Sequence, residues 1–321
     1  MESQRDGQTT FFDLAQAQRG SANVVLETIA REVDFRGVEA RIGATYSAGG
    51  RPACRAGVLL RIMILQHLYG LSDPQAEAQI KDRLSFQKFL ELGAEEAGPD
   101  ETTICRFRQR LIDCGLHTDL LGLLNQQLEA RGYILKRTTL VDATIVESSR
   151  KRPSREAVAE GTAPDASAGY TYKNARSYYG YKVHVASDGA HQLIRSAVIT
   201  SARAYDGHLL TQVVPAGAGV VYADKAYDTK TNHAWLKRHG VADQIMRRGA
   251  HHVKLSPATI QANWARSRVR RQIERVFAHF KRWQQYGRVR YLGLVKNQLE
   301  LTLKAVAYNL KRMVNLQNRH A

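Results

Sequence analysis

The spacing of apolar residues changes once along this chain, close to residue 138. Before that point the apolar residues recur at helical intervals, most clearly in RAGVLLRIMILQHLYG at residues 55–70. After it come short runs rich in β-branched residues, beginning with TTLVDATIVES at 138–148, which are typical of strands. The change predicts an N-terminal helical part and a later part built on a sheet.

The N-terminal part consists of predicted helices separated by turn residues, and we assign it to a helical domain over 1–135. Asp73 is expected to cap one helix, with Pro74 at its first position. Helix, tight turn and helix fit both a DNA-reading helix-turn-helix and a plain helical bundle, so both interpretations stay open. The helices are predicted within residues 22–33, 55–70, 71–84, 99–116 and 117–133.

The part after residue 138 predicts one mixed sheet flanked by helices. Three meandering strands come first, and helices then alternate with two further strands. A Ser-, Gly- and Pro-containing polar segment at 148–177 is expected to be an exposed loop between the first two strands. We assign 136–290 to this domain and 291–321 to a C-terminal helix that packs on its core. The strands are predicted within 138–148, 178–187, 191–202, 219–224 and 243–248.

Positive charge is concentrated at the C-terminal end. Residues 229–321 hold 20 Lys and Arg against 3 Asp and Glu, which accounts for the whole net charge of +17. Such asymmetry favours a polyanionic partner, because Lys and Arg displace the counterions condensed on phosphates. A basic surface that serves solubility is the alternative. The charge shares its helices with aromatic residues, including Trp264 and Trp283, and we therefore favour nucleic acid.

Several protein classes are disfavoured by what the sequence lacks. It has no run of about 18 apolar residues, which argues against a membrane span. Its polar first residues do not resemble a secretory signal. Cys54, Cys105 and Cys114 are odd in number and have no C-x-x-C spacing, which argues against a disulfide framework and a zinc site. We expect a cytoplasmic protein with reduced thiols.

Three carboxylates stand in unusual places. Asp142 interrupts a strongly apolar strand, and Asp224 ends the strand GVVYAD. Glu274 is the one acid in VRRQIERVFAHFKR, at residues 269–282, which predicts a basic amphipathic helix. Hard cations such as Mg²⁺ bind carboxylate oxygens, and two ions about 4 Å apart can clamp a phosphoryl displacement. The three acids therefore form a candidate metal site.

Each of these residues also has an ordinary explanation. Single acids at strand ends are common. Glu274 shares a helical face with Arg270 and Lys281, and it could simply form an intrahelical ion pair. Glu147 lies five residues after Asp142 and should point to the other side of a regular strand, so it is left out of the set.

Four segments resemble motifs of bacterial insertion-sequence transposases of the DDE class, specifically the insertion-sequence-five group. They are TLVDATIVES, YYGYKVHVASD, VVYADKAYD and RQIERVFAHFK. The segments GRPACRAGVLLRIMILQHLYGLSD and PDETTICRFRQRL resemble that group's helical N-terminal domain. The family signature around the third acid is Tyr, two residues, Arg, three residues, Glu, six residues and Lys. Ser267 stands where its Tyr belongs, and Ala226 stands where many relatives have Gly.

The resemblance implies a ribonuclease-H-like catalytic core preceded by a helical DNA-binding domain. It implies that Asp142, Asp224 and Glu274 are catalytic metal ligands for Mg²⁺, with two ions expected and Mn²⁺ able to substitute. Arg270 and Lys281 of the signature would contact phosphates. The chain would then cut insertion-sequence ends and join them to target DNA.

The expected partner is double-stranded DNA, with a homodimer assembled on it because two ends are joined in one event. The alternative function is a DNA-binding regulator or an inactive transposase remnant without catalysis. Lys182 is expected on a strand beside that of Asp142, where it could reach phosphate or simply face solvent. The other cations expected to contact DNA are Arg271, Arg275, Arg282 and Lys225.

Overall fold

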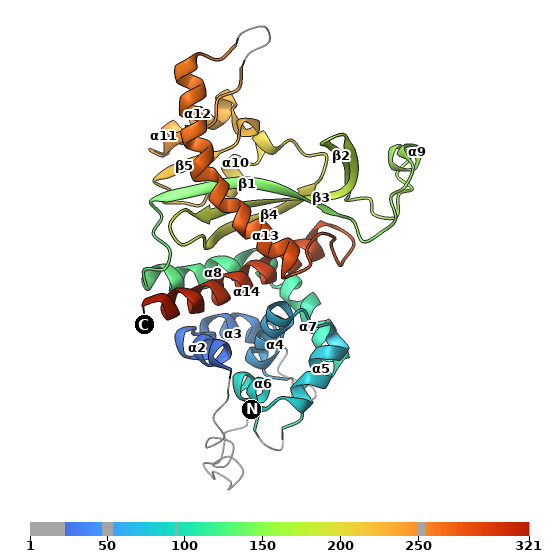
Figure 1. The fold of residues 1–321 in the computed structure, drawn as a ribbon. Helices are drawn as coiled ribbons and strands as arrows, with labels where there is room; N and C mark the ends of the chain where they lie inside the picture. The colour runs from blue at the N-terminus through green and yellow to red at the C-terminus, as the bar shows by residue number, and fades with distance from the viewer. Residues whose placement is uncertain (1–22, 47–53, 94–95, 250–253, 321) are drawn as a thin grey trace. The chain divides into compact units, whose positions relative to one another are not determined.

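The computed structural model describes residues 23–46, 54–93, 96–249 and 254–320. The remaining positions, including the predicted helix start at Ala22 and the first residues of the 1–135 domain, lie outside the described residues. The chain divides into two compact units, Met1–Cys114 and Gly115–Ala321 (Figure 1). Within the described ranges, no helix combines the length and apolar character that crossing a membrane requires.

The described part of the first unit is helical, as expected. Helix α4 is buried on nearly all sides, because it packs against α3, α5, α6 and α7. The short helices α3 and α6 were not predicted from the sequence. The helices of this unit are α2 (Val24–Glu32), α3 (Arg36–Gly43), α4 (Ala56–Tyr69), α5 (Asp73–Asp82), α6 (Leu84–Leu90) and α7 (Glu101–Asp113).

The N-terminus of α5 corrects one prediction. Ser72, not Asp73, caps the helix, and it forms a reciprocal capping box with Gln75. Asp73 occupies the first helical position, where its carboxylate pairs with Arg108 of α7 at 2.6 Å. Asp73 therefore links α5 to α7 and is not the N-cap of α5.

The second unit contains the predicted sheet. Its helices are α8 (Leu116–Ala130), α9 (Arg155–Ala159), α10 (Leu210–Val213), α11 (Lys230–Arg238), α12 (Pro257–Arg270), α13 (Glu274–Arg282) and α14 (Leu294–His320). Three 3-10 turns accompany them, η1 (Asp206–His208), η2 (Lys225–Tyr227) and η3 (Arg271–Ile273). Its strands are β1 (Thr138–Glu147), β2 (Gly169–Lys173), β3 (Arg176–Asp188), β4 (Ile194–Ser201), β5 (Val220–Ala223) and β6 (Ala242–Ile245).

The sheet combines an antiparallel meander with two parallel strands. Strand β3 pairs antiparallel with β1, β2 and β4, while β5 runs parallel to β1 and β6 parallel to β5. The order β2-β3-β1-β5-β6, with β4 also paired to β3, places β1 at the centre. Helices flank this sheet (Figure 1), and the arrangement confirms the predicted mixed sheet flanked by helices.

The register separates the two faces of the sheet. Val141 is paired with Ala186 of β3 and with Ala223 of β5, so these side chains share one face, where α10 and α11 supply apolar residues such as Leu210 and Leu236. Asp142, one residue along β1, points to the other face. Helix α12 contacts β1 and β5, and Figure 1 shows it crossing them.

Helices α8 and α14 cover β4. The Asn309 side chain of α14 accepts from the backbone N–H of Ile194 and donates to Asn125 of α8. Gln298 of α14 accepts from the N–H of Ile199 and donates to the carbonyl of Ala197. These amides satisfy backbone groups that an edge strand would otherwise leave unpaired. The sequence had placed α8 in the N-terminal helical domain. In the structure, α8 belongs to the second unit.

Two further predictions need correction. The 148–177 segment is not loop throughout, because it contains α9 and β2. The basic stretch 269–282 is not one helix, because η3 separates α12 from α13. Ile273 of η3 is fully buried, and η3 contacts β1, so packing on the sheet accompanies the break in the helix.

Candidate active site

Two of the three predicted acids lie side by side. Strands β1 and β5 are parallel, and their register pairs Val141 with Ala223. The next residue on each strand is an aspartate, so Asp142 and Asp224 follow neighbouring positions and point to the same side. Asp142 lies within β1, whereas Asp224 lies just beyond the carboxyl end of β5.

The Asp142 carboxylate is largely buried, with its side chain 20% exposed. Burial raises the pKa of Asp142, and the negative charge of Asp224 raises it further, whereas Arg270 and the N–H of Ala143 lower it. The Ala143 N–H donates to the carboxylate at 2.8 Å. Asp224 is therefore close enough to oppose the ionisation of Asp142.

Asp224 is held by its own turn. Its carboxylate accepts the backbone N–H of Lys225 at 2.7 Å and caps the 3-10 turn η2. This geometry follows from a β-region residue at the end of a strand, where an Asp side chain turns back on the next N–H. The carboxylate is thereby fixed at the edge of the sheet.

A cation already contacts the aspartates. Arg270, the last residue of α12, forms an ion pair with Asp142 through its guanidinium. The side chain of Arg270 is 15% exposed, and its Nε is buried without a hydrogen-bond partner. The sequence also allowed an ordinary intrahelical ion pair between Arg270 and Glu274. In the structure, Arg270 pairs with Asp142 of the sheet instead.

Glu274 begins α13 and is exposed. Within the described ranges its carboxylate makes no hydrogen bond or ion pair. Because η3 intervenes, Glu274 does not follow Arg270 on one regular α-helical face. The structure thus brings Asp142, Asp224 and Arg270 together and leaves Glu274 at the start of the next helix.

No group of three His, Cys, Asp or Glu side chains that could hold a metal ion occurs in the part of the chain that the structure describes. The two adjacent aspartates nevertheless fit a hard divalent cation. Their donors are carboxylate oxygens, and the ionisation of Asp142 is opposed by burial and by a neighbouring negative charge. A bound cation would offset both the cost of burial and the repulsion from Asp224, as Arg270 does in part.

Apart from Arg270, the cations predicted to contact DNA fall into two groups. Lys182 pairs with Asp206 at 2.9 Å and donates to the carbonyl of Ala204 at 2.8 Å. Its register partner is Ile145, whereas that of Asp142 is Val185, so Lys182 lies on the opposite face of the sheet from Asp142. The structure does not bring Lys182 to the aspartates. The exposed predicted cations are Arg271, Arg275, Lys281, Arg282 and Lys225.

The sequence did not place one cation, Lys173, near the aspartates. It ends β2, and a tight turn through Asn174 and Ala175, both with positive φ, leads into β3. Its charge lowers the pKa of Asp142, and it adds to burial in lowering the pKa of Lys281. The alternating sequence YTYKNARS around an Asn was a signal for this hairpin.

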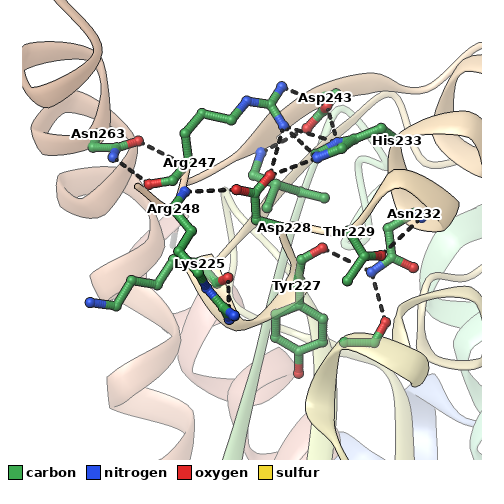
Figure 2. Close-up of polar contacts among 12 residues, drawn as sticks. Lys225, Tyr227, Asp228, Thr229, Asn232, His233, Asp243, Arg247, Arg248 and Asn263 are labelled. Atoms are coloured by element: carbon green, nitrogen blue, oxygen red, sulfur yellow. Dashed lines mark hydrogen bonds and ion pairs between the residues drawn. The ribbon is translucent and has the colours of Figure 1, made fainter. Parts of the chain in front are cut away.

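A second polar cluster was also missed (Figure 2). His233 of α11 lies between two carboxylates, with Nε2 2.7 Å from Asp228 and Nδ1 2.7 Å from Asp243. Arg247 pairs with Asp243 at 2.9 Å, and the N–H of Arg248 donates to Asp228 at 2.7 Å. We call these five residues the His233 network.

The His233 network stabilises the turn that starts at Asp224. Burial opposes ionisation of Asp228, but the N–H of Arg248, His233 and Arg247 together lower its pKa below the ordinary value. The Arg248 guanidinium donates to the carbonyl of Lys225 at 3.0 Å. The network thus links α11, β6 and the residue that follows Asp224.

Comparison with known proteins gives a family match over most of the chain. The family described as "Transposase DDE domain" matches residues 134–310, which include all three predicted acids. A second family, described as a transposase domain, matches residues 14–110. Among solved structures, the cryo-EM structure of the piggyBac transposase synaptic complex with hairpin DNA is 8% identical. That alignment covers 95% of this chain and 76% of that chain, with a TM-score of 0.38.

Proposed function

This chain belongs to the family of transposases with a DDE domain, and on that premise we propose that Asp142, Asp224 and Glu274 perform metal-dependent DNA cleavage and strand transfer. The observation that carries the proposal is the placement of Asp142 and Asp224 at neighbouring positions of two parallel strands. Membership makes the chain a DNA transposase. The assignment of individual residues, the metal and the steps of the reaction are our proposal.

The two aspartates would hold a divalent cation, Mg²⁺ or Mn²⁺, with two ions as the expected number. A bound ion would lower the pKa of an attacking water and stabilise charge on the transferred phosphate. Glu274 is proposed as a third ligand because it is exposed, has no described partner and follows the segment that contacts Asp142. Arg270 holds the Asp142 carboxylate and can exchange it for a DNA phosphate.

The cations around the aspartates support DNA as the substrate. Lys173, Arg270 and Lys281 lie close enough to Asp142, or to one another, to shift pKa values. We propose that they position the scissile strand, and that the N-terminal helical unit recognises the ends of the element. A homodimer on DNA, membership of the insertion-sequence-five group and action on bacterial cytoplasmic DNA complete the proposal.

The first experiment exposes the purified protein to fragments of its own genomic neighbourhood, with Mg²⁺ or with EDTA, and maps breaks by sequencing. Metal-dependent breaks at the ends of a repeat-bounded element are expected, and Glu274→Gln should abolish them. Glu147→Gln is the matched control, because Glu147 also lies at the sheet but pairs with Arg288 and Arg176. Binding without breaks by folded protein would favour the non-catalytic regulator instead.

A further inference from the structure

Helices α13 and α14 enclose a pocket of about 360 Å³ on the second unit. Its lining contains the basic residues Arg275, Lys311, Arg312 and Arg319, and no Asp or Glu. We call these four residues the α13–α14 cations. Only Arg275 was singled out from the sequence.

The cations line one pocket because of helical spacing. On α14, Arg312 and Arg319 are seven residues apart, a spacing that returns to one side of a helix, and the neighbouring Lys311 also lines the pocket. On the same helix Leu310 and Met313 are fully buried, whereas Lys311 and Arg312 are partly exposed and Arg319 is exposed.

The charges act on the same small space. Burial and the positive charge of Lys311 lower the pKa of His279 to about 4, so this pocket imidazole is neutral at pH 7. Burial raises the pKa of Tyr308 to about 12, against the opposing effect of Arg312 and Arg275. The cations thus act electrostatically on the other side chains of the pocket, beside the larger effect of burial.

One of the cations is held in place. The Nε of Arg312 donates to the backbone carbonyl of His191 at 2.8 Å, which fixes the direction of its guanidinium. Lys311 lies over the ring of Trp283, 5.8 Å from its centroid, and Trp283 is 69% exposed. Like charges held together without carboxylates repel one another, and a polyanion relieves that repulsion.

The pocket also adjoins the segment that carries the third predicted acid. Arg275 follows Glu274 directly in α13. Gln192 in the pocket wall donates to the side chain of Gln272 in η3 at 3.4 Å. A strand whose phosphates occupy the pocket would therefore pass beside the proposed catalytic segment.

We propose that the α13–α14 pocket is a binding site for backbone phosphates of duplex DNA. The proposal rests on the proposed function, since it names a path of the same substrate beyond the aspartates. The α13–α14 cations act there as phosphate contacts that set position and affinity but carry no base specificity.

The test measures binding of a labelled duplex in EDTA, where cleavage does not interfere, over a range of salt concentrations. The pocket variant is Lys311→Gln with Arg319→Gln. The control is Lys237→Gln with Arg238→Gln, two exposed cations at the end of α11. Thermal unfolding of all proteins checks that each is folded.

The pocket variant should lose roughly 5- to 10-fold in affinity per removed phosphate contact near 0.1 M salt, with a slope of log affinity against log salt shallower by about 1 per contact. The control should keep the wild-type affinity and slope. Equal behaviour of the two double variants would overturn the pocket proposal while leaving the aspartate site standing. Failure of the wild type to bind DNA at any salt would instead remove the proposed function, and the pocket proposal with it.

A photocrosslink gives a second readout that does not depend on the stability of the charge variants. p-Benzoylphenylalanine in place of Asn315, an exposed pocket residue, should crosslink to duplex DNA. The same group in place of the exposed Ala234 on α11 should not. Crosslinking at Ala234 but not at Asn315 would contradict the proposal.

Discussion

The second unit contains two acidic clusters that are linked through the turn after β5 and differ in how many hydrogen bonds their carboxylate oxygens accept. In the His233 network, both carboxylates accept from several donors, and the pKa values of Asp228 and Asp243 are lowered. At the candidate active site, burial and Asp224 raise the pKa of Asp142, and Glu274 has no described partner. A saturated cluster, in which the carboxylate oxygens all accept hydrogen bonds or ion pairs within the protein, stabilises a fold. An unsaturated cluster, in which some carboxylate oxygens have no such partner, retains the capacity to bind a ligand.

The largest expected effect comes from the unsaturated cluster. Asp224→Asn should reduce DNA cleavage by roughly a thousandfold or more, because it removes a ligand of an ion expected to supply several kcal/mol of transition-state stabilisation. Single-turnover cleavage rates measure this effect. Duplex binding in EDTA should be retained, and cleavage at the wild-type rate would remove Asp224 from the site.

The next effect comes from the saturated cluster. His233→Ala should lower the free energy of unfolding by about 1–3 kcal/mol, because it removes the imidazole whose two nitrogens each lie 2.7 Å from a partly buried carboxylate, that of Asp228 or of Asp243. Thermal denaturation should show it, at about 2–4 °C for each kcal/mol. His239→Ala, an exposed histidine at the end of the same helix, is the control. An equal loss in both variants would mean that the network contributes no special stability.

The two clusters should respond to pH with opposite sign. The pKa of Asp243 is lowered from 3.8, so its contribution to stability is present at neutral pH and is lost as pH falls through the folded-state pKa. The pKa of Asp142 is raised from 3.8, so the fold bears a cost at neutral pH that disappears as pH falls.

Urea unfolding at several pH values measures this contrast. As pH falls from 7 toward 3.8, the ordinary pKa of an aspartate, the stability of the wild type should rise relative to that of Asp142→Asn. Once pH passes below 3.8, the stability of the wild type should fall relative to that of Asp243→Asn. Parallel pH curves for the two variants would contradict the assigned pKa directions.

The smallest effects concern the cations beside Asp142. Arg270→Gln should raise the pKa of Asp142 further, and Lys173→Gln should raise it by less, because the Arg270 charge has the larger influence. Lys173→Gln should also raise the pKa of Lys281. NMR titration of the carboxyl and ammonium signals tests these expected pKa shifts. An unchanged pKa of Lys281 in Lys173→Gln would place Lys173 away from the site.

The sequence predicted the sheet and the position of two aspartates on its strands, for a physical reason. An acid inside an apolar strand is costly without a use, so Asp142 and Asp224 were visible as exceptions to a clear local pattern. Their adjacency followed once β1 and β5 paired. The choice of Ser72 over Asp73 as the cap of α5 was within reach of the sequence, since Ser and Gln at a spacing of three form a capping box.

Other features depended on packing that no local pattern records. Val269, Ile273, Val276 and Phe280 fit one helix, yet burial of Ile273 on the sheet accompanies the break at η3. The His233 network joins residues of α11, of β6 and of the connecting segments after η2 and β6, so only the folded register brings them together. The same holds for the α13–α14 cations, which come from separate helices.

The most direct test of the account is Mn²⁺ binding, followed by electron paramagnetic resonance without DNA or cleavage. We predict that the wild type and Glu147→Gln bind Mn²⁺ with the same affinity, and that Asp142→Asn and Asp224→Asn each weaken binding by about 10-fold or more, by analogy with the 10- to 100-fold cost of losing a ligand's supporting partner. Glu274→Gln should weaken binding as well, if less. Wild-type affinity in both aspartate variants would contradict the claim that these residues form the metal site.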